Sequence, residues 1–253
     1  MAPARADRGD TIEVRAAAAE IDAALAALGS SDRAVNEKAY LKSDLEFYGV
    51  SVPGIRSVVK AFAKQHPRIE HDEVVGLAVA LWEAPVHERR MAAVELLTHD
   101  AALLGPADMP LLERLLRESR TWAFVDNLAG TIVGGIVERH AELADRVLDR
   151  WARDDDFWIR RSALLALLGG LRRGEGDFER FSRYADAMLE EKEFFVRKAI
   201  GWVLRETGKK RPELVYEWLL PRAARASGVT VREAVKPLSE SQRAEVIRLR
   251  TSP

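Results

Sequence analysis

Apolar residues recur at helical spacing along almost the whole chain. Between residues 52 and 62, for example, Ile55, Val58, Val59 and Phe62 stand at positions i, i+3, i+4 and i+7. The period-two alternation of a β-strand is not sustained anywhere, and the sequence has no Asn-Gly or Asp-Gly hairpin turn. The pattern predicts an all-α protein with helices near Thr11–Leu28, from Val52 to Phe62, and at His71–Trp82, His87–Leu97, Ala107–Arg117, Thr121–His140, Glu142–Trp151, Asp156–Arg172, Phe178–Leu189, Glu193–Arg205, Pro212–Ala224, Thr230–Val235 and Ser239–Leu249.

The links between these helices are short, which indicates helix pairs stacked side by side in an α-solenoid. One internal echo supports a repeat. The eight residues from Asp156 and the eight from Glu193 both read acid, aromatic, aromatic, aliphatic, basic, basic, and begin 37 residues apart. This period is close to the ~40–47 residues of HEAT-type repeats, although two amphipathic helices can share such a pattern by chance. Since no linker is rich in Pro, Gly or Ser, we expect a single domain over residues 9–253, after a disordered start at residues 1–8.

Composition removes several classes of protein. The 253 residues are 47% hydrophobic and 31% charged, and they include no cysteine. The absence of cysteine excludes disulfide scaffolds, thiol nucleophiles and cysteine-ligated metal centres. No apolar run reaches the 18 residues of a membrane span, and the first residues lack the apolar stretch of a secretory signal. We therefore expect a soluble, cytoplasmic protein that does not associate with membranes.

The net charge of −1 hides an uneven distribution. Residues 1–150 carry a net charge of −6, residues 151–236 carry +4 and the remaining residues carry +1. Basic pairs in the second part include Arg160-Arg161 and Arg197-Lys198. Such groups are usually a solvated helix surface, but they also suit a face that contacts phosphates.

Two segments carry candidate chemistry. Trp122 and Asp126 are spaced i, i+4, which places an aromatic ring and a carboxylate on one helix face, a combination that suits stabilisation of a cation. Trp202 lies in a helix that is apolar on two faces. By spacing alone, the more common alternative is that the two tryptophans are core residues and that Asp126 is a buried structural acid or a helix-surface acid. The five histidines form no ligand pair with a nearby carboxylate, so we expect no metal site.

These segments, together with others along the chain, resemble the bacterial AlkD-type alkylpurine DNA glycosylases, which are built from HEAT-like repeats. The resemblance runs from Tyr40 to the end of the chain. Its motifs are Tyr40-Leu-Lys-Ser, the residues from Gly49 to Arg56, from Leu81 to Glu88, from Trp122 to Asp126 and from Phe157 to Arg161, the long stretch from Lys192 to Glu206, and the residues from Thr230 to Lys236.

This resemblance implies a C-shaped solenoid whose concave, basic face holds duplex DNA. It implies that Asp126 is the acidic residue of the catalytic site and that Trp122 and Trp202 are the active-site tryptophans. Arg161 would support DNA contact, and Tyr40 would lie on the DNA-facing surface. Arg160, Arg197 and Lys198 are added as DNA-binding candidates from the basic pairs. Ala123 departs from the acidic residue that often follows the first tryptophan in this family.

The resemblance implies a monofunctional hydrolase that releases N3- and N7-alkylated purines from double-stranded DNA without flipping the base. We expect this enzyme to be a monomer and to use no metal or cofactor. The chemistry fits the residues, because an alkylated purine is already a cationic leaving group and an ionised Asp126 could stabilise the oxocarbenium-like sugar and orient water. Bulky adducts could also be substrates. The alternatives are a non-catalytic HEAT-repeat module that binds damaged or branched DNA, and a protein-interaction scaffold.

Overall fold

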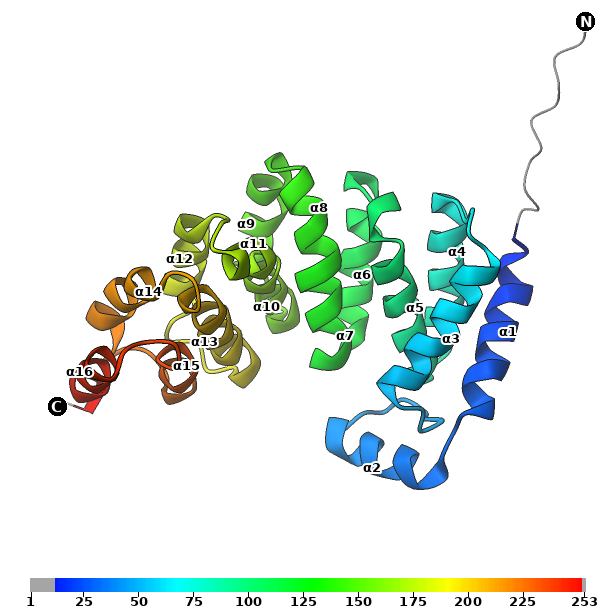
Figure 1. Ribbon diagram of the computed structural model, residues 1–253, viewed down its shortest axis with the longest axis horizontal. Helices are drawn as coiled ribbons and strands as arrows, with labels where there is room; N and C mark the ends of the chain where they lie inside the picture. The colour runs from blue at the N-terminus through cyan, green and yellow to red at the C-terminus, as the bar shows by residue number, and fades with distance from the viewer. Residues whose placement is uncertain (1–11, 252–253) are drawn as a thin grey trace, which may run out of the picture. The chain divides into compact units, whose positions relative to one another are not determined.

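The computed structural model describes residues 12–251, and these residues form an array of helices (Figure 1). Within this range the only β pairing is an isolated parallel bridge between Glu46 and Val86. The prediction of an all-α protein is confirmed, whereas the expected disorder of residues 1–8 falls outside the described residues. Every helix between residues 12 and 251 is too short or too polar to cross a lipid bilayer.

The chain divides into two compact units at the link between Leu104 and Gly105. The first unit contains α1 (Val14–Ala27), α2 (Ser31–Leu41), α3 (Val52–Gln65), α4 (His71–Trp82), α5 (His87–His99) and the short η1 (Ala101–Leu103). The second contains η2 (Pro106–Asp108), α6 (Met109–Ser119), α7 (Trp122–Asn127), η3 (Leu128–Val133), α8 (Gly134–Arg139), η4 (Ala144–Leu148), α9 (Asp149–Trp151), α10 (Phe157–Leu165), α11 (Leu168–Arg173), α12 (Phe178–Ala187), α13 (Phe194–Gly208), α14 (Pro212–Leu219), η5 (Leu220–Arg222), α15 (Gly228–Ala234) and α16 (Glu240–Thr251). Two compact units can share one domain, so the single domain stays a prediction.

In the first unit, a buried carboxylate holds the link between α2 and α3. Glu88, on α5, accepts hydrogen bonds from the backbone N–H groups of Tyr48, Gly49 and Val50 at 2.9, 2.7 and 3.1 Å. Gly49 has a φ of 78°, a left-handed conformation that a residue with a side chain rarely adopts. The helix before this link, α2, buries none of its residues. Apolar spacing therefore could not predict α2, and no helix was placed there from the pattern.

In the second unit, arginines connect helices at the spacing of one repeat. Among the described residues, six arginines bind a carboxylate that lies 35 to 37 residues earlier in the chain. We give the name arginine ladder to three of these pairs, Arg150 with Glu113, Arg180 with Asp145 and Arg222 with Asp186, whose separations are 37, 35 and 36 residues. The ladder connects α6 to α9, η4 to α12, and α12 to η5. These ion pairs therefore recur with the same period as the sequence echo.

Four more helices of this unit, α7, α10, α13 and α15, also pack in chain order. We call them the site row, because they carry the candidate residues. The two echo segments begin their helices at equivalent points: Asp156 is the N-cap of α10 and Glu193 is the N-cap of α13. The sequence echo thus corresponds to two helices in the same register.

Two departures from the predicted helices lie beside the site row. The expected helix Thr121–His140 is present, but its middle, η3, is a π-helix flanked by α7 and α8. The expected helix Asp156–Arg172 is interrupted after Leu165, and α11 begins only at Leu168. The interruption brings backbone close to backbone, because a Cβ on Gly134 would lie 2.7 Å from the carbonyl oxygen of Ala166. Only glycine allows α8 to pack there.

Candidate active site

The first turn of α7 carries the first two candidate residues. Thr121 caps this helix, with its hydroxyl accepting a hydrogen bond from the backbone N–H of Ala123 at 3.4 Å. Trp122 is the first helical residue and is 37% exposed. Asp126 follows one turn later on the same face. Because Phe124 and Val125 are fully buried, they fix the helix against the core and leave the face with Trp122 and Asp126 at the edge of the packed interior.

Asp126 is bound by Arg161 through a bidentate ion pair. The Arg161 Nη2 atom lies 2.7 Å from Oδ1 and 2.9 Å from Oδ2 of Asp126, and Nε lies 2.9 Å from Oδ1. The Arg161 side chain is only 3% exposed, whereas that of Asp126 is 23% exposed. The guanidinium therefore holds the carboxylate from the protein side, while the carboxylate itself still reaches solvent.

Arg161 also connects this pair to α13. Its Nη1 donates a hydrogen bond to the carbonyl oxygen of Phe195 at 2.5 Å. Its Cζ lies 5.9 Å from the centre of the Phe195 ring and 6.0 Å from the centre of the Trp202 ring, within range of cation–π attraction. One buried cation thus brings Asp126 of α7 and Trp202 of α13 to the same place.

Burial and neighbouring charge act on Asp126 in opposite directions. Burial raises the pKa of Asp126 above its ordinary value, and the positive charges of Arg161 and Lys198 oppose that rise without cancelling it. Three of the roughly four acceptor positions on a carboxylate are taken by Arg161. The remaining one is free to accept a hydrogen bond from water or to face a cation.

A regular pattern underlies the charges of the site row. Counted from the N-cap of each helix, Asp126, Arg161, Lys198 and Arg232 all occupy the fifth helical position. We call this set the fifth-position column. It contains one acid followed by three bases, and its one acid is the residue proposed for catalysis.

The other predicted DNA contacts are placed differently. The Arg160 guanidinium binds Glu191 at 2.8 Å and the carbonyl oxygens of Asp154 and Asp155 at 2.6 and 2.9 Å. The Arg197 Nε donates to the carbonyl of Glu191. Both side chains thus have structural partners, whereas Lys198 is exposed. A role in DNA binding stays a prediction for all three residues.

Tyr40 belongs to the first unit, where it is 73% exposed on α2. Its predicted contact with DNA also stays a prediction.

An aromatic cluster beside Arg161 was not singled out from the sequence. The ring of Phe195 lies 4.8 Å from Trp158 and 6.5 Å from Phe157, and the ring of Phe194, which is 50% exposed, lies 5.3 Å from Phe195. The signal was present, since the echo segments share an aromatic pair at the same position. It was used as evidence of a repeat rather than of a site.

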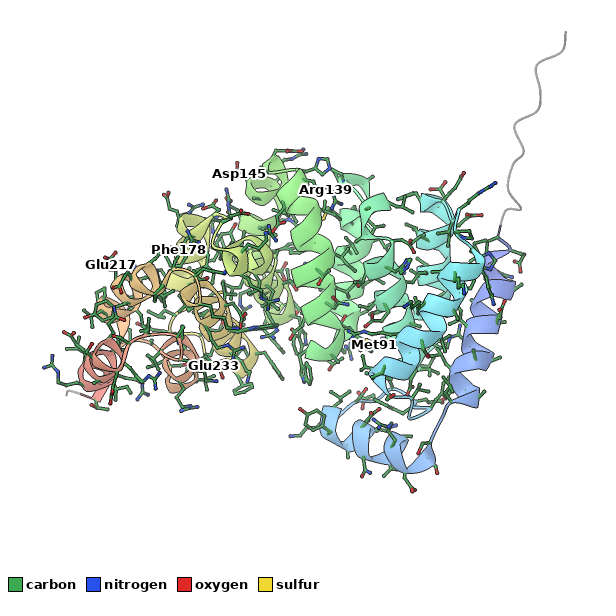
Figure 2. The ribbon with its side chains drawn as sticks, viewed as in Figure 1. Met91, Arg139, Asp145, Phe178, Glu217 and Glu233 are labelled. Carbon is green, nitrogen blue, oxygen red and sulfur yellow. The ribbon has the colours of Figure 1, made fainter. Side chains whose placement is uncertain are left out.

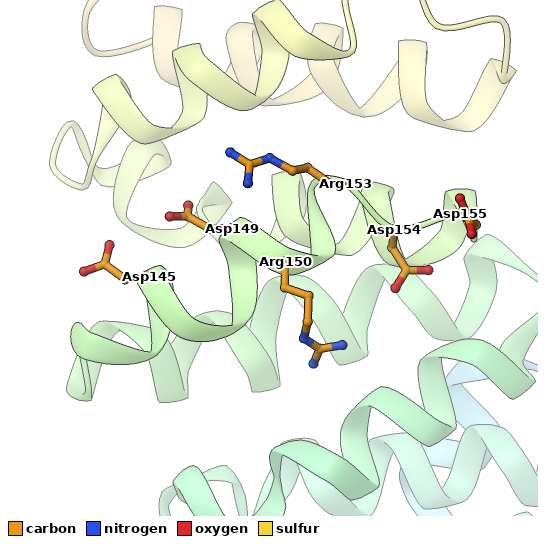
Figure 3. Close-up of a pocket in the computed structure, with 6 residues that line it drawn as sticks. All are labelled: Asp145, Asp149, Arg150, Arg153, Asp154 and Asp155. Atoms are coloured by element: carbon orange, nitrogen blue, oxygen red, sulfur yellow. The ribbon is translucent and has the colours of Figure 1, made fainter.

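One cavity of the second unit is lined by none of the candidate residues. It has a volume of about 660 Å³ and is lined by charged side chains (Figure 3), namely Asp145, Asp149, Arg150, Arg153, Asp154 and Asp155. Several of these side chains belong to the arginine ladder or bind its neighbours. Between residues 12 and 251, no three His, Asp or Glu side chains are grouped as metal ligands would be.

Comparison with known proteins gives consistent similarities. The model of the DNA alkylation repair enzyme family matches residues 21–238. A structure from Enterococcus faecalis, described as a predicted DNA alkylation repair enzyme, shares 22% identity over 84% of this chain and 97% of its own, with a TM-score of 0.75. AlkD2 from Streptococcus mutans shares 17% identity over 88% of this chain and 98% of its own, with a TM-score of 0.51. At these identities the two structures show a common fold. No curated protein matches the chain.

Proposed function

This chain belongs to the DNA alkylation repair enzyme family, and from that premise we propose that it is a monofunctional DNA glycosylase. The proposed substrate is double-stranded DNA that contains N3- or N7-alkylated purines, and the proposed reaction is hydrolysis of the N-glycosidic bond. The observation that carries the proposal is the Asp126 carboxylate, which is oriented by buried Arg161, lies in the neighbourhood of Trp202 and is still exposed at one edge.

The proposed mechanism needs no general acid. A purine alkylated at N3 or N7 is already positively charged, so it can leave as a neutral base when the bond to the sugar breaks. The sugar then carries oxocarbenium-like positive charge. Asp126 faces that charge as an anion, and its remaining acceptor position binds the water that attacks the sugar carbon. The proton lost by this water passes to Asp126 or to solvent.

Arg161 and the tryptophans have supporting roles in this proposal. The bidentate contact fixes the direction of the Asp126 carboxylate, and the positive charge of Arg161 opposes the rise in the pKa of Asp126 that burial causes. Trp122 and Trp202 offer aromatic faces to the sugar or to the cationic base, with an attraction of ~0.5–2 kcal/mol each. Because these groups act on the sugar, the base need not be flipped out of the helix.

The test is release of N7-methylguanine from a duplex, measured under single-turnover conditions. We expect Asp126→Asn to lower the rate by roughly 10²-fold or more, since it removes the charge that the transition state needs. Asp186→Asn is the matched control, because Asp186 is also bound in a bidentate fashion by an arginine, Arg222, elsewhere in the same unit. The control variant should keep the rate of the unmodified protein.

Three outcomes would contradict the proposal or part of it. Absence of release by the unmodified protein, combined with salt-dependent DNA binding, would favour a non-catalytic module that binds damaged DNA. Equal rates for the unmodified protein and Asp126→Asn would remove Asp126 from the mechanism. Release of methylpurines but of no larger N3 or N7 adduct would limit the substrate range, which we propose to include bulky adducts.

A further inference from the structure

Two guanidinium groups converge on one glycine at the start of α15. A Cβ built on Gly228 would lie 3.1 Å from Nη2 of Arg250 and 3.2 Å from Nη1 of Arg232. Since each nitrogen is about 3 Å from the same point, the two nitrogens are at most about 6 Å apart. The residues come from different helices, α15 and α16, so this proximity is made by the fold rather than by the sequence order.

Neither of these arginines has an acidic partner within residues 12–251. This distinguishes them from nearby arginines: Arg225 binds Glu190 at 2.7 Å, and Arg248, on the same helix as Arg250, lies 3.9 Å from Glu245. Two like charges held close together without a counter-charge repel each other. An anion placed between them removes that repulsion and gains hydrogen bonds from both guanidinium groups.

The position of the pair relates it to the candidate active site. Arg232 is the last member of the fifth-position column, which begins at Asp126 and continues through Arg161 and Lys198. The backbone of α15 is fixed against α13, because the hydroxyl of Thr230 donates to the carbonyl oxygen of Arg197 at 3.1 Å. Glu233, which lies beside α13 (Figure 2), is bound by Arg205 and Lys236, so its carboxylate already has two basic partners.

We propose that Arg232 and Arg250 together bind one backbone phosphate of the substrate duplex. In the site row, the helix α15 that carries Arg232 is two positions after the helix α10 that carries Arg161. The proposal rests on the proposed function, which makes DNA the substrate. A phosphodiester carries the anionic oxygens that guanidinium groups bind best. The contact is independent of base sequence, and it anchors the duplex so that the lesion reaches Asp126.

The experiment compares DNA binding by the full-length protein and its variants over a range of salt concentrations. The double variant Arg232→Gln/Arg250→Gln should bind a lesion-containing duplex roughly tenfold more weakly, and the slope of log affinity against log salt should fall by about one. Arg248→Gln removes one paired charge from the same helix and is the matched control, which should bind like the unmodified protein.

Catalysis separates this inference from the proposed function. If the unmodified protein excises the base and the double variant binds DNA with unchanged affinity and salt slope, the phosphate site is wrong and the glycosylase assignment stands. If the unmodified protein releases no base while the double variant still loses affinity and salt slope, the phosphate site stands and the glycosylase assignment is wrong.

Discussion

At the scale of single residues, the central feature is a carboxylate under two opposing influences. Burial raises the pKa of Asp126, and Arg161 opposes the rise. A glycosylase that uses this carboxylate needs it ionised, so protonation of Asp126 should stop the reaction. Because the pKa lies above the ordinary aspartate value, activity should be lost at a higher pH than an exposed aspartate would allow.

We therefore predict an acid limb in the pH profile of base release. Single-turnover rates, corrected for spontaneous depurination, should fall as the pH decreases through the pKa of Asp126, with a midpoint above about 3.9. Arg161→Lys replaces the bidentate contact by a single point charge, so it should lower the rate and move the midpoint to still higher pH. Arg222→Lys makes the same change in the arginine ladder and should leave the profile where it is. A midpoint that does not respond to Arg161→Lys would show that another group controls the limb.

Part of this site could be predicted from the sequence. The i, i+4 spacing of Trp122 and Asp126 is local, so it is visible in one helix. The pairing of Asp126 with Arg161 is not visible in the sequence, because the two residues are 35 positions apart and meet only through the packing of α7 against α10. The sequence reading gave Arg161 a role in DNA contact, and the structure shows it to be buried against Asp126 and Phe195. That geometry supports a positioning role for it.

At the scale of elements, one carboxylate of the arginine ladder has a lowered pKa. It belongs to Glu113 on α6, which accepts hydrogen bonds from Arg150, Arg117 and the indole N–H of Trp151. The hydrogen bond from Arg150 contributes most, and together these donors lower the pKa of Glu113 to about 2. Since the ordinary value is 4.5, the folded state binds this proton less readily than the unfolded chain does.

We predict that Glu113→Gln destabilises the protein at neutral pH but not in acid. A lowered folded-state pKa contributes stability that is complete above the unfolded pKa and is lost as the pH falls through the folded pKa. The variant should lose about 2 kcal/mol of unfolding free energy at pH 7, less than the full pKa shift would give because the Arg150 side chain is half exposed to solvent. The difference should shrink between about pH 5 and pH 2. Urea denaturation of both proteins at several pH values measures this difference in unfolding free energy. Glu190→Gln, in the exposed pair with Arg225, should change the free energy by less than about 1 kcal/mol, and an equally large effect there would contradict the interpretation.

The predictability of the elements follows how each one is stabilised. Helices with an apolar stripe, such as α3 and α6, begin and end near the predicted positions because burial determines them. The helix α2 buries nothing and so leaves no stripe to find. The π-helix η3 and the interruption after Leu165 depend on close backbone packing around Gly134, which a one-dimensional pattern does not contain.

At the scale of the whole molecule, the division at Leu104 and Gly105 raises the question of cooperativity. The sequence has no long linker rich in Pro, Gly or Ser at this point. Repeat proteins are stabilised mainly by contacts between neighbouring repeats, so a compact unit need not be an independent domain.

We predict a single cooperative unfolding transition for the full-length chain. Calorimetry should give equal calorimetric and van't Hoff enthalpies, and far-ultraviolet circular dichroism and tryptophan fluorescence should report the same midpoint. The six tryptophans lie on both sides of the division, at positions that include Trp82 and Trp218, so fluorescence follows both units. Two separated transitions would show that each unit is a domain of its own.

The arginine ladder also bears on how the chain reaches this structure during synthesis. Each of its pairs joins residues no more than 37 positions apart, so closing a pair requires only a short loop, and such local topologies fold rapidly. Each repeat can dock on its predecessor soon after it leaves the ribosome, because domains and repeats form from the N-terminal end onward. The pair of Asp126 and Arg161 can therefore assemble while α16 is still being made, and the contact of Arg250 with its neighbours is among the last to form.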